Sequence, residues 1–336
     1  MIPVAVSVGL AFFITFAITP VMMRYLSSVG VVGIDMNKRG KPILPSSGGV
    51  CVAIGLISGL LAYTGISVFF YGTSEFLVYI LAAISSILIV TFAGILDDMN
   101  VSLRKVKTKD GEEDIRVGIP QWVKPLMTLP AAIPLMAVNA GVSVMNIPFF
   151  GDVNFGLMYP LLLIPIGFVG ASNMVNMLGG FNGIEAGMGL LYMSSLGIYA
   201  FLHGSPAYII FLPAAAALLA FLFYNRYPAR ILPGDSLTYL LGSVAVAGII
   251  IGNMEKIGII MLMPFIIEFF LKVRSKFSAT SLGKLREDGT LGAPYGKSIY
   301  SLTHVVMNLR RLNERQIFWV FIILQAVFCM IPFLLF

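Results

Sequence analysis

Residues 157–187 read LMYPLLLIPIGFVGASNMVNMLGGFNGIEAG, an apolar run followed at once by amide and acid side chains set among glycines. The length and composition of the run predict a membrane-spanning helix. Asn173, Asn176, Asn182 and Glu185 follow it, at a depth where polar groups are tolerated only if they line a water-filled cavity. Glycine lets the backbone approach a ligand closely. The stretch therefore predicts a helix that ends in a polar site.

The composition of the whole chain indicates the same environment. Of its 336 residues, 58% are hydrophobic and 11% are charged, and the mean hydropathy is +0.93. A soluble globular protein carries about 25% charged residues, so this chain has too little polar surface for a water-exposed domain. Cys51 and Cys329 lie in apolar runs without metal-ligand spacing, and we expect buried or lipid-facing thiols rather than a disulfide.

The fold class that we predict is all-α integral membrane, with about ten transmembrane helices in a single polytopic catalytic domain over residues 1–336. The first apolar run has no basic N-terminal region and no small-residue cleavage site, so we expect a retained helix rather than a signal peptide. The apolar runs of spanning length cover 3–26, 49–70, 76–96, 122–140, 156–175, 184–203, 206–224, 237–254, 256–273 and 316–336.

The basic residues predict the orientation of these helices. Of the 22 Lys and Arg residues, only Lys256 falls in an even-numbered connection, and the others flank or occupy the odd-numbered ones. By the positive-inside rule, the odd connections are cytoplasmic and both termini lie outside. The net charge of +6 is explained by this topology, so no nucleic-acid partner is expected.

Two of the cytoplasmic connections are long, at about 99–121 and 272–315. The first contains KDGEED between short polar stretches that carry valine and isoleucine, which predicts a small β-hairpin. The second is rich in Lys, Arg, Gly and Ser, and within it Tyr300–Leu312 is predicted to form an amphipathic helix at the membrane interface.

Acidic residues beside apolar runs are costly and therefore informative. Asp97 and Asp98 close the third run, Asp235 begins the eighth, Glu185 follows the fifth, and Lys124 enters the fourth. All of them lie at the predicted cytoplasmic ends. Carboxylate and amide oxygens without a His or Cys cluster suit Mg²⁺, with Mn²⁺ as an alternative. The basic side chains of Lys124, Arg274 and Lys276 would complement phosphate charge.

Each of these residues also has a structural interpretation. An Asp pair at a helix end is often simply solvated, although it opposes the helix dipole there. Asp235 could cap the helix that follows it. Asn173 and Asn176 lie three residues apart on one helical face and could join two helices by hydrogen bonds. The gathering of the whole set on one side of the membrane is what favours a site.

The motifs GILDDMN, NMVNMLGGFNGIEAG and YPARILPGDSLTYLLG, in this order across ten spans, resemble those of the polyprenyl-phosphate N-acetylhexosamine-1-phosphate transferases. The resemblance covers nearly the whole chain. The middle motif is similar to that of the eukaryotic and archaeal branch, which makes dolichyl-diphosphate-GlcNAc from UDP-GlcNAc. Bacterial relatives typically have two further acidic residues, at the places of Gly180 and Asn182. The stretch DMNKRGKPILPSSGG also resembles the first cytoplasmic loop of the family, which contributes to nucleotide binding.

The resemblance implies a role for each matching residue. Asn176 and Asp235 would hold Mg²⁺. Asp97, Asp98 and Lys124 would be catalytic and would serve the phosphates. The substrate-binding residues that it implies are Asn37, Lys38, Asn173, Asn182, Glu185, Arg274 and Lys276. Two departures weaken this transfer. The loop after residue 272 has KVRSKF in place of the family's His-rich or Arg-His-Arg run, and Ser46 stands where the eukaryotic branch often has Glu.

The function predicted from the sequence is transfer of GlcNAc-1-phosphate from UDP-GlcNAc to dolichyl or a related polyprenyl phosphate, the first step of lipid-linked oligosaccharide assembly for protein N-glycosylation. The expected location is the plasma membrane of an archaeon or the endoplasmic reticulum of a eukaryote, among membrane lipids. Three alternatives stay open: a bacterial-type undecaprenyl-phosphate transferase, a secondary transporter, and a membrane scaffold. The oligomeric state is open between a monomer and a homodimer.

Overall fold

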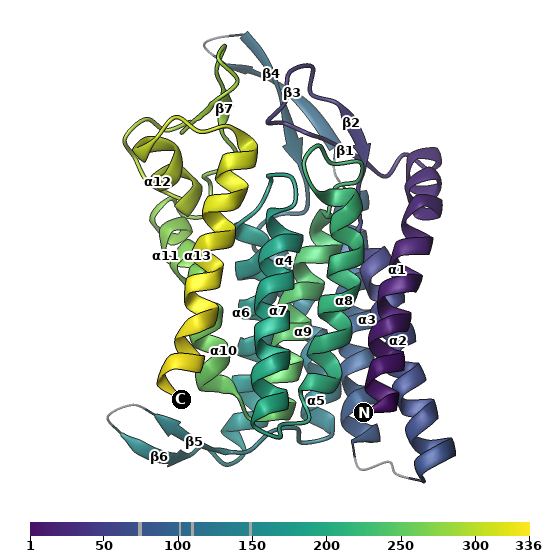
Figure 1. Cartoon of the computed structure of the whole chain (residues 1–336). Coiled ribbons are helices and arrows are strands. Elements are labelled where there is room, and N and C mark those ends of the chain that lie inside the picture. The colour runs from purple at the N-terminus through teal and green to yellow at the C-terminus, as the bar shows by residue number, and fades with distance from the viewer. Residues whose placement is uncertain (73–75, 101, 109–110, 148–149) are drawn as a thin grey trace.

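The computed structural model describes residues 1–72, 76–100, 102–108, 111–147 and 150–336, with the backbone alone for 102–108, 111–117 and 147. In these ranges, eight helical segments are long and apolar enough to cross a membrane, and they pack side by side in a bundle (Figure 1). This arrangement confirms the predicted all-α membrane fold. The eight are α1 (Ile2–Ser28), α2 (Gly49–Tyr71), α3 (Leu77–Met99), η2 with α6 (Tyr159–Leu163 and Ile164–Met177), α7 (Ile184–Leu202), α8 (Tyr208–Asn225), α9 (Gly234–Gly252) and α13 (Glu314–Leu335).

The other two predicted spans are helical but interrupted, so ten continuous helices was too simple a prediction. Residues 122–140 form α4 (Val123–Thr128), η1 (Leu129–Ala132) and α5 (Ile133–Ala137). Residues 256–273 form α10 (Glu255–Met261) and α11 (Met263–Arg274). Prolines begin the pieces, with Pro130 in η1, Pro134 in α5 and Pro264 in α11. Proline lacks the N–H group that a continuous helix needs, which accounts for the breaks.

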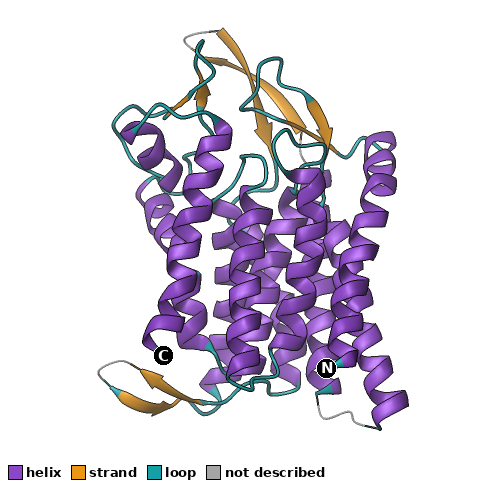
Figure 2. Cartoon of the chain, viewed as in Figure 1, coloured by secondary structure: helices purple, strands orange, loops and turns teal. Residues whose placement is uncertain are grey.

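Short antiparallel hairpins connect the helices (Figure 2). They pair β1 (Val32–Ile34) with β2 (Ile43–Pro45), β3 (Ser102–Thr108) with β4 (Gly111–Val117), β5 (Val144–Ile147) with β6 (Gly151–Asn154), and β7 (Lys284–Leu285) with β8 (Leu291–Gly292). The β3–β4 pair confirms the hairpin predicted in 99–121, while residues 109–110 of its turn lie outside the described residues. Strands β1–β4 and β7 share one end of the bundle, here named the loop end, and both termini lie at the opposite end with β5–β6 (Figure 1).

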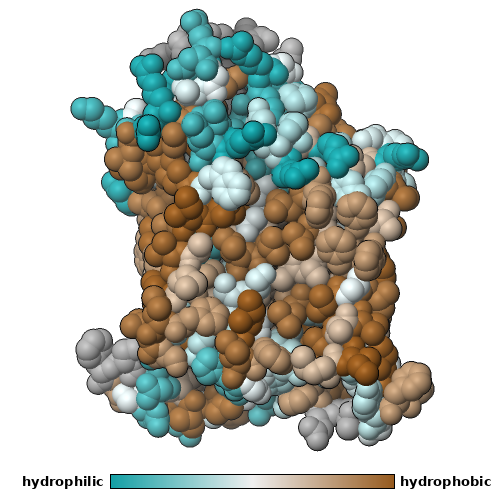
Figure 3. All heavy atoms as spheres, viewed as in Figure 1, coloured by the Kyte–Doolittle hydropathy of each residue, from teal (hydrophilic) through white to brown (hydrophobic). Residues whose placement is uncertain are grey.

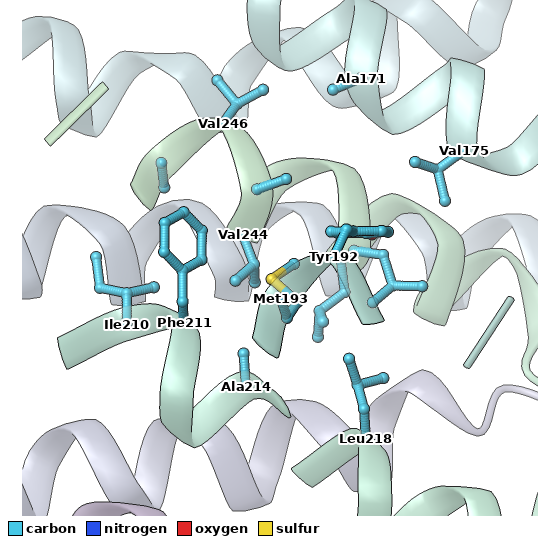
Figure 4. Close-up of a cluster of buried hydrophobic side chains, with 14 of the residues drawn as sticks. Ala171, Val175, Tyr192, Met193, Ile210, Phe211, Ala214, Leu218, Val244 and Val246 are labelled. Atoms are coloured by element: carbon cyan, nitrogen blue, oxygen red, sulfur yellow. The ribbon is translucent and has the colours of Figure 1, made fainter. Parts of the chain in front are cut away.

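The polar loop end and the apolar bundle are distinct on the surface. The face that Figure 3 shows carries hydrophilic side chains at the loop end and a hydrophobic band below it. Helix α9 lies at the centre, because 83% of its apolar window is buried against 28% for α13. Tyr192 and Met193 of α7, Phe211 of α8 and Val244 of α9 pack together in this core (Figure 4).

Glycines bring the first turn of α9 very close to its neighbours. A Cβ on Gly49 of α2 would lie 2.2 Å from the backbone N of Leu237, and one on Gly94 of α3 would lie 2.4 Å from Cα of Ser236. Only glycine fits such a backbone contact without a shift of the helices. The position of Asp235, at the start of α9, is therefore set by contacts with α2 and α3.

The long connection 275–313 is held on α11 by buried polar groups. Glu268 accepts a hydrogen bond from the backbone N of Leu302 at 2.7 Å, and Lys272 Nζ donates to Ser281 Oγ at 2.7 Å. The predicted amphipathic helix is present as α12 (Leu302–Leu309), which is shorter than the range 300–312. Its buried face packs within this connection, since His304 Nε2 contacts the Thr280 carbonyl at 2.9 Å.

Candidate active site

Three carboxylates and one lysine from three helices meet at the loop end. Asp97 and Asp98 end α3, Lys124 lies near the start of α4, and Asp235 begins α9. Lys124 Nζ is 2.7 Å from Asp97 Oδ2 and 2.7 Å from Asp235 Oδ2. The four residues are named the acid–lysine cluster below. The structure thus brings together residues from three segments that are far apart in the sequence.

Asp98 is engaged on both of its oxygens. It accepts hydrogen bonds from the backbone N of Asp235 at 2.8 Å, the backbone N of Ser236 at 3.2 Å and Ser47 Oγ at 2.7 Å. The carboxylate therefore caps the N-terminus of α9, where the helix dipole favours a negative charge. This contact compensates for its unfavourable place at the C-terminal end of α3. Asp98 positions Asp235 through the same bonds.

Asp97 and Asp235 differ in their access to solvent. The Asp97 side chain is 2% exposed, and its Oδ2 accepts from Tyr239 OH at 2.7 Å as well as from Lys124. The Asp235 side chain is 25% exposed and Lys124 is 13% exposed. A ligand that approaches from the loop end can therefore reach Asp235 and Lys124 more readily than Asp97.

The two asparagines of α6 have different partners. Asn173 Nδ2 donates to Thr128 Oγ1 at 3.1 Å and to the Val169 carbonyl at 2.8 Å, so it joins α6 to α4. Asn176 Oδ1 accepts from Thr238 Oγ1 at 3.0 Å. Because Thr238 follows Asp235 by three residues on α9, the amide of Asn176 faces the same end of α9 as the carboxylate of Asp235. Both asparagines thus join helices, Asn173 linking α6 to α4 and Asn176 linking α6 to α9.

A second polar cluster surrounds Lys38, in the loop between β1 and β2. Lys38 Nζ is 2.7 Å from Asp35 Oδ2 and 2.8 Å from Glu314 Oε2, and it donates to Asn182 Oδ1 at 2.5 Å. Asn182 also donates its backbone N–H to Glu314 Oε1 at 2.8 Å and accepts from the backbone N of Ala229 at 2.9 Å. The first loop, the α6–α7 loop and the start of α13 are held together here. We name these residues the Lys38 cluster.

The glycine-rich loop beside the Lys38 cluster depends on Asn37 and Glu185. Asn37 Nδ2 donates to the Gly180 carbonyl at 2.7 Å, and Glu185 Oε1 accepts from the Gly180 backbone N at 2.7 Å. Gly180 has a φ of +95°, and a Cβ on Gly179 would lie 2.4 Å from Glu185 Oε1. Glu185 Oε2 is buried without a hydrogen-bond partner among the described residues. This hydrogen-bond acceptor lies next to a loop whose backbone conformation and close packing require glycine.

Two of the predicted residues, both basic, have no partner among the described residues of the site. Arg274 and Lys276 are exposed at the end of α11, and none of the ion pairs within the described residues includes them. Sequence reasoning also missed partners of the site, namely Asp35, Ser47, Tyr239 and Glu314. The capping pattern Asn313-x-x-Gln316 marks where α13 begins, but no signal in it shows that Glu314 reaches Lys38.

The oxygen atoms at the site suit a Mg²⁺ ion that the protein coordinates only in part. Among the described residues, no group of three or more His, Cys, Asp or Glu side chains is placed to enclose a metal ion. The carboxylate of Asp235 and the amide of Asn176 are oxygen donors on facing helices. Mg²⁺ often takes only one or two carboxylates and completes its shell with water and substrate phosphates. The residues present fit an ion shared with a substrate rather than one enclosed by protein.

Comparison with known proteins identifies related sequences. The model of glycosyl transferase family 4 matches residues 77–253, which contain the acid–lysine cluster. A Saccharolobus solfataricus protein named as a UDP-N-acetylglucosamine–dolichyl-phosphate N-acetylglucosaminephosphotransferase is 33% identical, over 100% of this chain and 96% of its own length. The Dictyostelium discoideum protein of that name is 24% identical over 94% of this chain and 83% of its own length. A phospho-N-acetylmuramoyl-pentapeptide-transferase of Clostridium perfringens is 31% identical over 72% of this chain and 71% of its own length.

Proposed function

Because the chain belongs to glycosyl transferase family 4, we propose that it transfers N-acetylglucosamine 1-phosphate from UDP-GlcNAc to dolichyl or a related polyprenyl phosphate. The acceptor phosphate oxygen attacks the β-phosphorus of UDP-GlcNAc. The bond between that phosphorus and the bridging oxygen breaks, and UMP leaves with the oxygen. The products are UMP and GlcNAc-diphospholipid, which enters lipid-linked oligosaccharide assembly for N-glycosylation.

The observation that carries this proposal is the position of Lys124 between Asp97 and Asp235. Phosphoryl transfer needs positioning and charge neutralisation more than covalent chemistry from the protein. A lysine held by two carboxylates is fixed in place, and the third of its N–H groups remains for a phosphate oxygen at the exposed edge of the cluster. Mg²⁺ or Mn²⁺, held by Asn176 and Asp235, would neutralise further charge on the diphosphate.

The hydrogen bonds of the aspartates support direct attack over an aspartyl-phosphate intermediate. Asp97 is nearly inaccessible and holds Lys124 and Tyr239, while Asp98 is occupied by the start of α9. Neither carboxylate is presented to an incoming phosphorus. An acceptor phosphate is already largely dianionic near neutral pH, so it needs little help from a base. The role of Asp97 would be to orient Lys124.

The Lys38 cluster and the glycine-rich loop are the proposed site for the sugar nucleotide. Glycine backbone permits close approach, and the unpartnered oxygen of Glu185 is an acceptor for an N–H or O–H group. Asn37, Lys38 and Asn182 hold the loop in place. The phosphate contacts expected of Arg274 and Lys276 stay a prediction.

A transfer assay with purified protein in detergent tests the proposal. Labelled UDP-GlcNAc should give UMP and labelled lipid with dolichyl phosphate, and the comparison with undecaprenyl phosphate decides between the two acceptor classes. A transporter would break no bond of UDP-GlcNAc, so UMP formation in detergent, without a sealed vesicle, excludes that alternative. Activity should require Mg²⁺ or Mn²⁺, and Asp235→Asn should abolish it. The matched variant Asp288→Asn changes an exposed aspartate at the loop end and should stay active. Full activity of Asp235→Asn in EDTA would contradict the metal role.

The proposed orientation places the loop end in the cytoplasm and both termini outside. It rests on the basic residues of the odd connections. Asp288→Cys should react with a membrane-impermeant thiol reagent only from the cytoplasmic side, and Asp152→Cys only from outside. Cys51 and Cys329 are buried, so the background reaction should be small. Labelling of both positions from the same side would overturn this topology.

A further inference from the structure

A crevice of about 750 Å³ lies between the end of α8 and the start of α13. Gly183 and Gly187 lie behind two residues that line it, Phe318 and Leu222. A Cβ on Gly187 would lie 2.9 Å from the ring of Phe318, and one on Gly183 would lie 3.4 Å from Leu222. Glycine at position 187 therefore lets Phe318 pack close to α7. Helices α8 and α13, whose ends supply its lining, lie on either side of α7 (Figure 1).

The residues that line the crevice change from apolar to basic along the helix axes. Leu222, Phe318 and Trp319 lie within the apolar spans, and Trp319 is 56% exposed. Arg226 directly follows α8, and Arg315 is the second residue of α13, so both stand where the spans end. Apolar and aromatic side chains below arginines are typical of the boundary between the hydrocarbon and the head groups of a bilayer.

The arginines of the crevice have aromatic rings as neighbours rather than carboxylates. Within the part of the chain that the structure describes, none of the ion pairs includes Arg226, Arg230 or Arg315. The Arg226 guanidinium lies 5.8 Å from the ring centre of Phe223, and that of Arg315 lies 5.5 Å from that of Tyr227. The planar guanidinium is suited to bidentate binding of a phosphate.

We propose that this crevice binds the phosphate head group of an anionic membrane phospholipid. Arg226 and Arg315 hold the phosphate from two sides, and Leu222, Phe318 and Trp319 contact the start of an acyl chain. Basic pockets between transmembrane helices bind lipid head groups in this way. The apolar walls face the bilayer, so the occupant comes from the membrane and not from the solution.

The crevice is separate from the acid–lysine cluster and adjoins the Lys38 cluster. The bonds of Lys124, Asp97 and Asp98 go to one another, to the start of α9, and to Ser47 and Tyr239, none of which lines the crevice. Tyr227, however, has Lys38 Nζ 4.6 Å from its ring centre in addition to Arg315. A lipid bound at Arg315 therefore lies next to the proposed sugar-nucleotide loop. The bound lipid would stabilise the start of α13, which carries Glu314.

Trp319 supplies a probe that does not depend on catalysis. The chain has two tryptophans, and Trp122→Phe leaves Trp319 alone in the full-length protein. This variant is placed in nanodiscs of phosphatidylcholine with brominated phosphatidylglycerol or brominated phosphatidylcholine. The brominated phosphatidylglycerol should quench Trp319 at a lower lipid fraction. Adding Arg226→Gln and Arg315→Gln should weaken this preference roughly 25-fold, at about fivefold for each arginine near the surface.

The matched control removes two arginines outside the crevice, with Arg310→Gln and Arg311→Gln in the same Trp122→Phe background. It should keep the full preference for phosphatidylglycerol. Equal quenching by the two lipids, or an equal loss of preference in both double variants, overturns the proposal. If free glycerol 3-phosphate displaces the brominated phosphatidylglycerol, the occupant need not come from the membrane, and the proposal is overturned. If dolichyl phosphate relieves the quenching at a lower lipid fraction than unbrominated phosphatidylglycerol does, the crevice is a site for the acceptor lipid. That result would also overturn the proposal.

Discussion

Replacing Lys124 with methionine tests whether its charge holds the acid–lysine cluster together. Its ammonium group lies 2.7 Å from both Asp97 and Asp235, and the Asp97 side chain is 2% exposed. Removing one partner of a buried ion pair costs about 3–5 kcal/mol, because an uncompensated charge stays buried. Asp235 is 25% exposed and can be hydrated, so we expect the lower end, about 3 kcal/mol, in the free energy of unfolding.

A double variant separates lost charge compensation from lost packing. In Lys124→Met with Asp97→Asn, the most buried carboxylate is neutral, so roughly half of the lost stability should return. Mg²⁺ should stabilise the single variant more than the double variant, because the single variant retains both carboxylates. Turnover should fall in both by about 10²–10³, the effect typical of losing one preorganised charge-stabilising group.

Unfolding in mixed detergent micelles, with and without Mg²⁺, measures these differences. The matched control is Lys284→Met, an exposed lysine of the loop end, which should change the free energy of unfolding by less than about 0.5 kcal/mol. A loss below about 1 kcal/mol in Lys124→Met would refute the reasoning. So would a double variant whose losses simply add, since the two residues would then be uncoupled.

Three further predictions follow from particular contacts. Gly94→Ala should displace Asp235 and lower kcat strongly, because its Cβ would meet the backbone of Ser236. The control Gly65→Ala has open space around its Cβ and should keep wild-type activity. Equal activities of the two variants would contradict the packing argument. Asn182→Ala should weaken UDP-GlcNAc binding in calorimetric titration, while Asp97→Asn should lower kcat with binding nearly intact. Similar losses of affinity in both variants would contradict separate roles for the Lys38 cluster in donor binding and the acid–lysine cluster in transfer. Burial lowers the pKa of His304, helped by nearby Lys272, and its Nδ1 accepts the Tyr300 N–H at 3.2 Å. The unfolded state therefore takes up a proton first as the pH falls below about 6.5, so the folded state loses stability in acid. The amides of α12 should be less protected from hydrogen exchange at about pH 5 than at about pH 7.5. Unchanged protection would contradict the lowered pKa of His304.

The sequence by itself determined the membrane class, the ends of most helices and the gathering of the polar groups at one end of the helices. These properties are local, because the cost of placing a charge in hydrocarbon can be read from about 20 consecutive residues. The breaks between the predicted spans at 204–205 and at residue 255 have the same local origin, and α7 and α9 do end just before them. The interruptions at Pro130, Pro134 and Pro264 were equally visible in the sequence, but hydropathy outweighed them in the prediction of continuous spans.

Only the tertiary structure decided which of these polar groups are partners. Lys124 and Asp235 are 111 residues apart, and Lys38 and Glu314 are 276 residues apart. Hydropathy sets the depth of a side chain in the membrane but not the rotation of its helix about its own axis. That rotation depends on how helices pack, here on glycines that admit the backbone of α9 between α2 and α3. The same packing separated the roles of two adjacent aspartates, since one α-helical step turns Asp97 toward Lys124 and Asp98 toward the start of α9.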